Sequence, residues 1–99
     1  MRTTSPHPQA PVIFVLEDEP DIAGLICASL TEYGFRCEHL RTGRELLARA
    51  HTASPDLCIV DLGLPDMDGM QVVRELQDGT PCAVLILTGR NELTDRVLG

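Results

Sequence analysis

The chain has 99 residues, with 15 acidic side chains against eight basic ones and a formal net charge of −7. All eight basic residues are arginines, and they do not gather into a basic stripe. An acidic chain of this kind argues against nucleic-acid binding by this segment itself and suits binding of a cation or of a basic partner surface. The apolar runs are too short to cross a membrane, and the N-terminus lacks the layout of a signal peptide. The length allows at most one domain, and the absence of tryptophan predicts an aliphatic core.

The four cysteines are spread along the chain without a C-x-x-C pair. We predict that Cys27, Cys37, Cys58 and Cys82 are reduced core residues of a cytoplasmic protein. Disulfides are rare in that compartment, and buried free cysteines behave as small hydrophobic side chains. Disulfide bonds and metal ligation are the alternatives.

Residues 1–11 contain three prolines together with serine and threonine, which predicts a flexible tail. Val12 to Leu16 is rich in β-branched residues and is predicted to form the first strand. Pro20 then suits the first turn of a helix, and Gly34 suits its end. The apolar face of this helix is expected at Ile22, Leu25, Ile26, Leu30 and Tyr33.

Phe35 to Leu40 mixes apolar and polar residues and is predicted to form a second, less buried strand. A second helix is expected to begin after Thr42, which caps it, with Glu45 three residues later completing a capping box. The inner face of this helix is predicted to consist of Leu46, Leu47 and Ala50.

Two continuous apolar runs dominate the second half of the chain. Leu57 to Val60 and Cys82 to Thr88 are predicted strands that are buried on both faces. A short helix between them ends near Gly79 and has Val72, Val73 and Leu76 on its inner face, and another helix begins near Leu93. The alternation of strands and helices predicts an α/β fold with a doubly wound, mainly parallel sheet.

Polar side chains stand at the ends of three of these strands. Glu17 and Asp18 follow the first strand, Asp61 follows the third, and Thr88 ends the fourth. Because ligands of open α/β sheets bind at the carboxyl edge, these groups are expected to converge there. Converging carboxylates repel one another unless a cation joins them, and ligands that are all oxygen favour Mg²⁺. A carboxylate that accepts a phosphoryl group fits such a site, and a solvated acidic rim is the alternative.

In their sequence order, these motifs resemble the receiver domain of bacterial two-component response regulators. The matching stretches are Leu16-Glu17-Asp18-Glu19-Pro20, Val60-Asp61-Leu62-Gly63-Leu64-Pro65-Asp66-Met67-Asp68-Gly69 and Leu85-Ile86-Leu87-Thr88-Gly89. The second stretch looks most like receivers that precede a winged-helix DNA-binding domain. The resemblance implies the flavodoxin-like strand order 2-1-3-4-5.

By this resemblance, Asp61 accepts a phosphoryl group from a phosphohistidine on a sensor histidine kinase. Asp18 and Asp61, with the backbone carbonyl of Gly63, are expected to bind Mg²⁺ directly, and Glu17 is expected to act through water. The Thr88 hydroxyl is expected to hydrogen-bond the phosphoryl oxygen. The expected protein is a phosphoacceptor signalling domain rather than an enzyme, with at most self-catalysed phosphoryl transfer and dephosphorylation.

The chain departs from the receiver pattern towards its C-terminus. It contains no lysine, whereas receivers carry a lysine and a switch aromatic residue on a fifth strand. Residues 12–99 are therefore expected to form a C-terminally incomplete receiver domain with strand order 2-1-3-4, in which the fifth strand and fifth helix are missing. A DNA-binding output domain is expected outside this chain, and the exposed edge of the fourth strand is expected to permit a homodimer.

Two alternatives stay open at this point. The first is a receiver-like interaction module that is not phosphorylated; the intact acidic set argues against it for the parent protein, and the missing lysine keeps it open for this chain. The second is an aspartyl-phosphate-type phosphohydrolase, a class that resembles a strand-end Asp followed two residues later by a second Asp, where this chain has Gly63. A nucleotide-binding domain is not expected, because neither G-x-G-x-x-G nor a P-loop follows the first strand.

Overall fold

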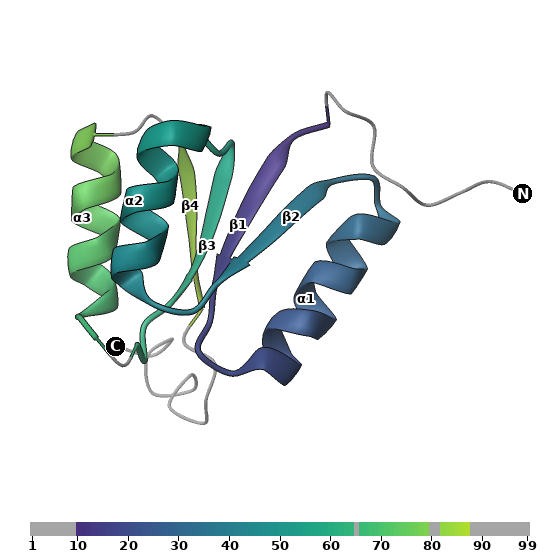
Figure 1. Cartoon of the computed structure of the whole chain (residues 1–99), viewed down its shortest axis with the longest axis horizontal. Coiled ribbons are helices and arrows are strands. Elements are labelled where there is room, and N and C mark those ends of the chain that lie inside the picture. Colours follow the sequence, from purple (N-terminus) through teal and green to yellow (C-terminus); the bar gives the residue numbers. More distant parts are fainter. Residues whose placement is uncertain (1–9, 65, 80–81, 88–99) are drawn as a thin grey trace, which may run out of the picture.

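The computed structural model describes residues 10–64, 66–79 and 82–87. In chain order its elements are β1 (Val12–Leu16), α1 (Pro20–Glu32), β2 (Arg36–Leu40), α2 (Gly43–Ala53), β3 (Leu57–Asp61), α3 (Gly69–Gly79) and β4 (Ala83–Leu87) (Figure 1). Each strand and helix predicted within these residues is confirmed in type and order. Most of the predicted tail, Thr88 and the predicted helix start near Leu93 lie outside the described residues.

The strands form one parallel sheet in the order β2-β1-β3-β4. This order confirms the predicted doubly wound α/β architecture. β1 lies between β2 and β3, and its last residue, Leu16, is paired with Val60 of β3. The residues that follow these two positions, Glu17 and Asp61, therefore lie side by side at the carboxyl edge of the sheet.

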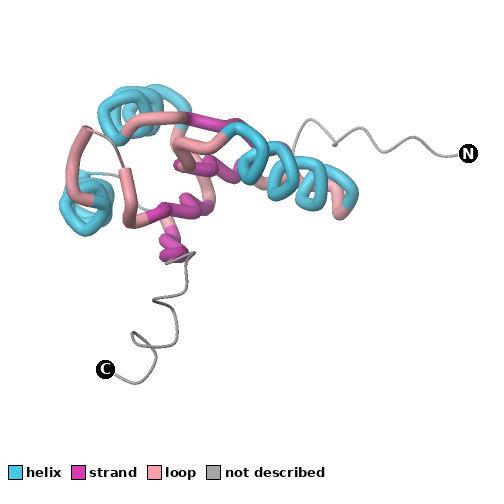
Figure 2. The backbone as a smooth tube through the Cα atoms, turned by 90° about the horizontal axis from the view of Figure 1, so that it is seen from below, coloured by secondary structure: helices cyan, strands magenta, loops and turns pink. Residues whose placement is uncertain are grey.

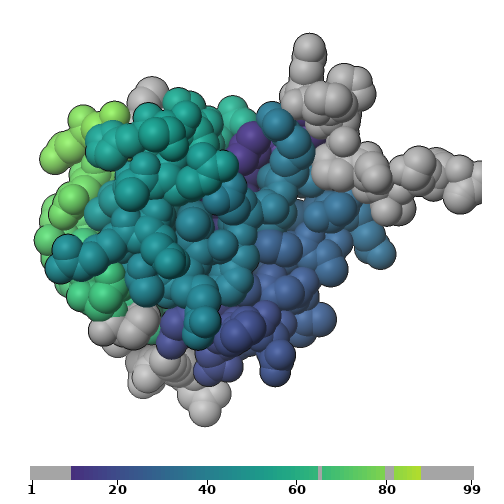
Figure 3. All heavy atoms as spheres, viewed as in Figure 1, coloured from purple at the N-terminus to yellow at the C-terminus, as the bar shows by residue number. Residues whose placement is uncertain are grey.

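The sheet separates two apolar layers, with α1 on one side and α2 and α3 on the other (Figure 2). Successive residues of β1 point to opposite layers, as expected for a strand that is covered on both faces. Phe14 and Leu16 are fully buried beneath α2 and α3, whereas Ile13 and Val15 face α1. Side chains of α2 and α3 close over their side of the sheet in the space-filling view (Figure 3).

Helix α2 begins as its sequence predicts. The Thr42 hydroxyl accepts a hydrogen bond from the Glu45 amide at 3.2 Å, which is the predicted cap. The Glu45 carboxylate reaches back to the amide of Arg41 at 3.1 Å, one residue earlier than a standard capping box would place it. The predicted inner face is confirmed, because Leu46 and Ala50 are buried and Leu47 packs beside them.

The sheet-facing side of helix α1 agrees in part with the prediction, because Ile26 and Leu30 lie on it while three other predicted residues do not. Its sheet-facing stripe consists of Ala23, Ile26, Cys27 and Leu30, which recur at helical spacing. Ile22, Leu25 and Tyr33 were expected to be inside, but their exposed fractions are 42%, 72% and 81%. Ala23 is fully buried where α1 meets the sheet, and the helix contacts β2 and β1.

The four cysteines form two pairs, which corrects the prediction that all of them are reduced. Cys27 of α1 and Cys37 of β2 are joined by a disulfide with their Cα atoms 5.6 Å apart. Cys58 and Cys82 are free, and their sulfur atoms lie 3.8 Å apart. Sequence spacing did not reveal the bond, because its two residues are ten positions apart and meet only when α1 packs beside β2.

Strand β4 forms the exposed edge that was expected, whereas burial on both of its faces is not found in the described residues. Leu85 and Ile86 are 51% and 39% exposed, because β4 pairs with β3 alone among the described strands. Helix α1 packs mainly against β2 and β1. Among the helices that the structure describes, none combines the length and the apolar character needed to traverse a bilayer.

Candidate functional site

Three carboxylates gather at the carboxyl edge of the sheet, which is its lower edge in Figure 1. Glu17 and Asp18 follow β1, and Asp61 is the last residue of β3. One oxygen of each side chain lies within 4.8 Å of an oxygen of the other two. The structure thus brings together the three acidic residues that the sequence singled out, and the parallel pairing of β1 with β3 is the cause.

Glu17 is the most buried member of this cluster, with 4% of its surface exposed. Burial raises the pKa of its carboxyl group, and the nearby charges of Asp61, Asp18 and Glu19 raise it further. A hydrogen bond from the Glu19 amide to Glu17 Oε2, at 3.2 Å, acts in the opposite direction. The metal-free site therefore disfavours a charged Glu17, which a bound cation would reverse.

The backbone of Glu17 is hydrogen-bonded to two residues of β2. The Glu17 amide donates to the carbonyl of Leu40 at 3.1 Å. Nε2 of His39 lies 2.6 Å from the Glu17 carbonyl oxygen, and because that oxygen can only accept, the imidazole nitrogen must be the donor. The strand end that carries the first two carboxylates is thus fixed by β2.

Asp61 is 9% exposed and shapes the loop that follows it. Its Oδ1 accepts a hydrogen bond from the Gly63 amide at 3.2 Å, and the Leu62 amide donates to the Leu87 carbonyl at 3.3 Å. The loop returns tightly at Gly69, where an added Cβ would lie 2.8 Å from Leu62 Cα and 3.1 Å from the Asp61 carbonyl oxygen. Only a residue without a side chain fits that contact.

Gly63 and Thr88 complete the set of residues predicted for the site. Gly63 is exposed and adjoins Asp61 through the hydrogen bond just described, so its carbonyl belongs to the same loop. Thr88 lies outside the described residues, and its predicted role stays a prediction.

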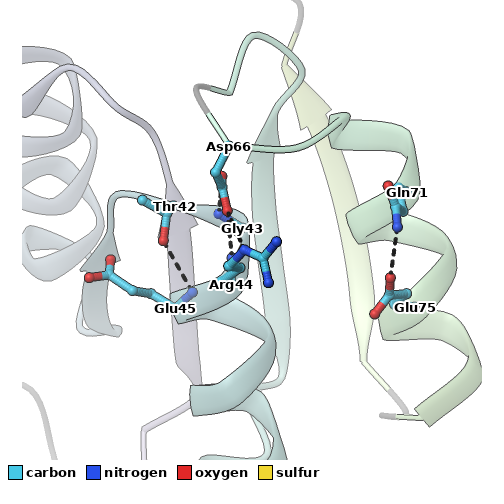
Figure 4. Close-up of polar contacts among 7 residues, drawn as sticks. All are labelled: Thr42, Gly43, Arg44, Glu45, Asp66, Gln71 and Glu75. Atoms are coloured by element: carbon cyan, nitrogen blue, oxygen red, sulfur yellow. Dashed lines mark hydrogen bonds and ion pairs between the residues drawn. The ribbon is translucent and has the colours of Figure 1, made fainter.

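Asp66 is part of the motif that follows Asp61, but no site role was predicted for it from the sequence. Its two carboxylate oxygens accept hydrogen bonds from the amides of Gly43 at 2.9 Å and Arg44 at 3.1 Å, at the start of α2 (Figure 4). These bonds, that from Gly43 above all, lower the pKa of Asp66. The sequence could not predict this contact, because an aspartate after a turn is common and its partner, Gly43, lies 23 residues away.

Comparison with known proteins identifies the group to which this arrangement belongs. The sequence profile of the response regulator receiver domain matches residues 13–98. The chain belongs to the response regulator receiver family. The four-stranded order 2-1-3-4 with three helices is the CheY-like, flavodoxin-like receiver fold. Receivers of this kind are signalling domains.

The sequence of the receiver is similar to those of bacterial transcriptional regulatory proteins. It is 38% identical over 92 residues to the transcriptional regulatory protein CreB of Escherichia coli, covering 92% of the receiver and 40% of CreB. The receiver spans between 34% and 40% of the length of the first curated relatives that it matches.

Solved structures show the same fold. A CheY-like response regulator receiver domain from Methylobacillus flagellatus has a TM-score of 0.78 at 22% identity, over 85% of the receiver and 74% of that chain. A response regulator protein from Burkholderia pseudomallei has a TM-score of 0.75 at 27% identity, over 81% of the receiver and 48% of that chain. That second structure contains a phosphorylated aspartic acid, a calcium ion and citrate.

The donor set of the receiver fits a hard divalent cation. All the converging side-chain ligands are carboxylates, and oxygen ligands suit Mg²⁺ and Ca²⁺ rather than softer metals. In the described part of the chain, the two ion pairs join Arg44 to Asp66 and Arg49 to Glu38, so none of the arginines described there forms an ion pair with this cluster. A cation at the cluster would therefore supply the missing positive charge.

Proposed function

We propose that this receiver takes a phosphoryl group onto Asp61 in the presence of Mg²⁺, with the phosphohistidine of a sensor histidine kinase as the donor. The observation that carries the proposal is the convergence of Glu17, Asp18 and Asp61 within 4.8 Å at the carboxyl ends of β1 and β3. The family to which the chain belongs, and a relative whose structure contains a phosphorylated aspartic acid, support it.

In the proposed transfer, an Asp61 carboxylate oxygen attacks the phosphorus atom, a new oxygen–phosphorus bond forms, and the nitrogen–phosphorus bond of the donor histidine breaks. The leaving imidazole nitrogen keeps the electron pair and takes up a proton. Asp61 Oδ1 is held by the Gly63 amide, which orients the carboxylate at the strand end. Transfer of this kind depends mostly on positioning and on charge stabilisation around the phosphoryl oxygens.

The residues proposed to hold the metal are Asp18 and Asp61 through their carboxylates, Gly63 through its carbonyl, and Glu17 through a water molecule. Bound Mg²⁺ supplies positive charge next to the phosphoryl oxygens. Thr88 is proposed to donate its hydroxyl hydrogen to the phosphoryl group. The chain contains no lysine, so no ammonium group of its own joins the metal beside the phosphoryl oxygens.

The wider setting of the domain is part of the same proposal. Residues 12–99 are proposed to be the receiver domain, and residues 1–11 precede it. We propose that the regulator works in the cytoplasm with a sensor histidine kinase. A DNA-binding output domain outside this chain is also proposed, because its longer relatives are named as transcriptional regulatory proteins. We also propose that β4, whose Leu85 and Ile86 are exposed, pairs with a second copy of the chain. Sedimentation equilibrium tests this pairing, and a monomer at micromolar concentration would contradict it.

The phosphoacceptor proposal is tested by incubating the chain with acetyl phosphate and Mg²⁺ and by measuring intact mass. One phosphoryl adduct is expected in the wild type, with acetate as the leaving group, and no adduct in Asp61→Asn. Asp18→Ala is expected to abolish both Mg²⁺ binding and the adduct. An adduct that persists in Asp61→Asn would refute the assignment, and turnover of p-nitrophenyl phosphate would favour a phosphohydrolase instead.

A further inference from the structure

The loop that connects β3 to α3 is bound to a second element through Asp66. Both oxygens of the Asp66 carboxylate are used, one by the Gly43 amide at 2.9 Å and the other by the Arg44 amide at 3.1 Å. Arg44 Nε lies a further 3.9 Å from Oδ2, but the Arg44 side chain is 84% exposed, so this ion pair adds little. The contact is therefore a bidentate clamp on the backbone of α2 (Figure 4).

The first turn of α2 explains why a distant carboxylate is suited to this place. The first four amides of a helix have no partner within it, and the positive end of the helix dipole favours a negative charge. The Glu45 amide is satisfied by the Thr42 hydroxyl, and the Leu46 amide by the Thr42 carbonyl. The local cap leaves the amides of Gly43 and Arg44, and these are the two that Asp66 accepts.

Close packing at Gly43 supports the same contact. A Cβ at Gly43 would lie 2.6 Å from the Met67 sulfur and 2.9 Å from Val72 Cγ2. The absence of a side chain lets the loop that carries Asp66 and Met67 approach the helix backbone directly. The Asp66 carboxylate and the missing side chain of Gly43 thus together hold the loop against the start of α2.

The seated loop begins at the phosphoacceptor. Asp61 precedes it, and Gly63, whose amide orients Asp61 and whose carbonyl is a proposed metal ligand, lies three residues before Asp66. At its other end Asp68 caps α3, with its Oδ1 accepting from the Met70 amide at 3.2 Å. Among the side chains described in residues 62–68, Asp66 is the one that hydrogen-bonds an element outside the loop and α3.

We propose that Asp66 is a positioning residue of the phosphoacceptor site, which holds the loop after Asp61 in place for metal binding by clamping it to the N-terminus of α2. This inference rests on the proposed function, because the ligands that it positions are those of the proposed Mg²⁺ site. Asp66 touches neither the metal nor the phosphoryl group and acts only through the backbone of its loop.

The test compares two variants that each remove hydrogen bonds from the same helix end. Asp66→Ala releases the loop, whereas Thr42→Ala removes the local cap and leaves the loop attached. Asp66→Asn keeps one acceptor oxygen in the same place and serves as the conservative variant. The measurements are amide hydrogen exchange in the metal-free chain and Mg²⁺ titration followed by amide NMR shifts.

Asp66→Ala is expected to speed exchange of the Gly63 amide and to weaken Mg²⁺ binding by about tenfold, the effect of losing one or two charge-assisted hydrogen bonds. Thr42→Ala is expected to loosen the first turn of α2 while leaving Mg²⁺ affinity within about twofold of the wild type, because the loop keeps its clamp. Asp66→Asn is expected to fall between the wild type and Asp66→Ala in both measurements.

Equal effects of Asp66→Ala and Thr42→Ala on Mg²⁺ affinity and on Gly63 exchange would overturn the inference, since Asp66 would then be only a helix cap. If Asp66→Ala fails to fold, the comparison of Asp66→Asn with Thr42→Ala decides in the same way. A wild-type chain that binds no Mg²⁺ would count against the proposed function instead. In that case the exchange of the Gly63 amide, measured without metal, still tests the positioning role of Asp66.

Discussion

The close packing at Gly69 predicts an unequal outcome for the same substitution at two glycines. Gly69→Ala would place a Cβ 2.8 Å from Leu62 Cα and 3.1 Å from the Asp61 carbonyl oxygen, both of which are backbone atoms. Gly24 lies in α1 with nothing within 4 Å of the position of its Cβ. Neither glycine has a positive φ, so contact and helix propensity alone distinguish them.

The expected magnitudes follow from these contacts. A Cβ that meets backbone cannot be relieved by rotating a side chain, so Gly69→Ala is expected to lower the free energy of unfolding by about 1–3 kcal/mol. Gly24→Ala is expected to raise it by about 0.5–1 kcal/mol, because alanine loses less backbone entropy in a helix. For a domain of this size, a loss of 1 kcal/mol lowers the melting temperature by about 4–8 °C.

Urea and thermal unfolding of the two variants and the wild type measure these changes. Since relief of the contact at Gly69 moves Leu62 and Asp61, amide NMR shifts in residues 61–63 are expected to change in Gly69→Ala and to stay constant in Gly24→Ala. A Gly69→Ala chain as stable as the wild type, with unchanged shifts at Asp61, would refute the close-packing argument.

Two further predictions concern the disulfide and the buried carboxylate. Replacing Cys27 and Cys37 by serine is expected to lower the free energy of unfolding of the oxidised chain by about 3 kcal/mol, the loop-closure entropy for a separation of ten residues, as measured by urea unfolding with and without reductant. Burial raises the pKa of Glu17 above 4.5, so its charge destabilises the metal-free fold at neutral pH. Glu17→Gln is therefore expected to be more stable than the wild type at neutral pH, with a difference that shrinks as the pH falls through the raised pKa towards 4.5.

Each of these predictions has a clear opposing result. Identical urea midpoints for the oxidised chain and the double serine variant would show that the cross-link does not restrict the unfolded chain. A metal-free Glu17→Gln chain that is less stable than the wild type at neutral pH would show that the hydrogen bond from the Glu19 amide outweighs burial and repulsion.

The amino-acid sequence by itself determined the order and type of the elements. The β-rich run at 12–16 and the apolar run at 57–60 are strands, and helical spacing placed α2 and α3, because both signals are local and depend on residues a few positions apart. The cap at Thr42 was predictable for the same reason. The convergence of Glu17, Asp18 and Asp61 also followed, since parallel strands end at one edge.

Only the tertiary structure decided which neighbours each element meets. The docking of α1 on β1 and β2 decides which of its residues face inward, and it also brings Cys27 and Cys37 together. Asp66 finds its partners at Gly43 and Arg44 because the loop after β3 passes over the start of α2. Such contacts join residues that are ten to 23 positions apart, and local sequence patterns carry no information about pairs that only packing brings together.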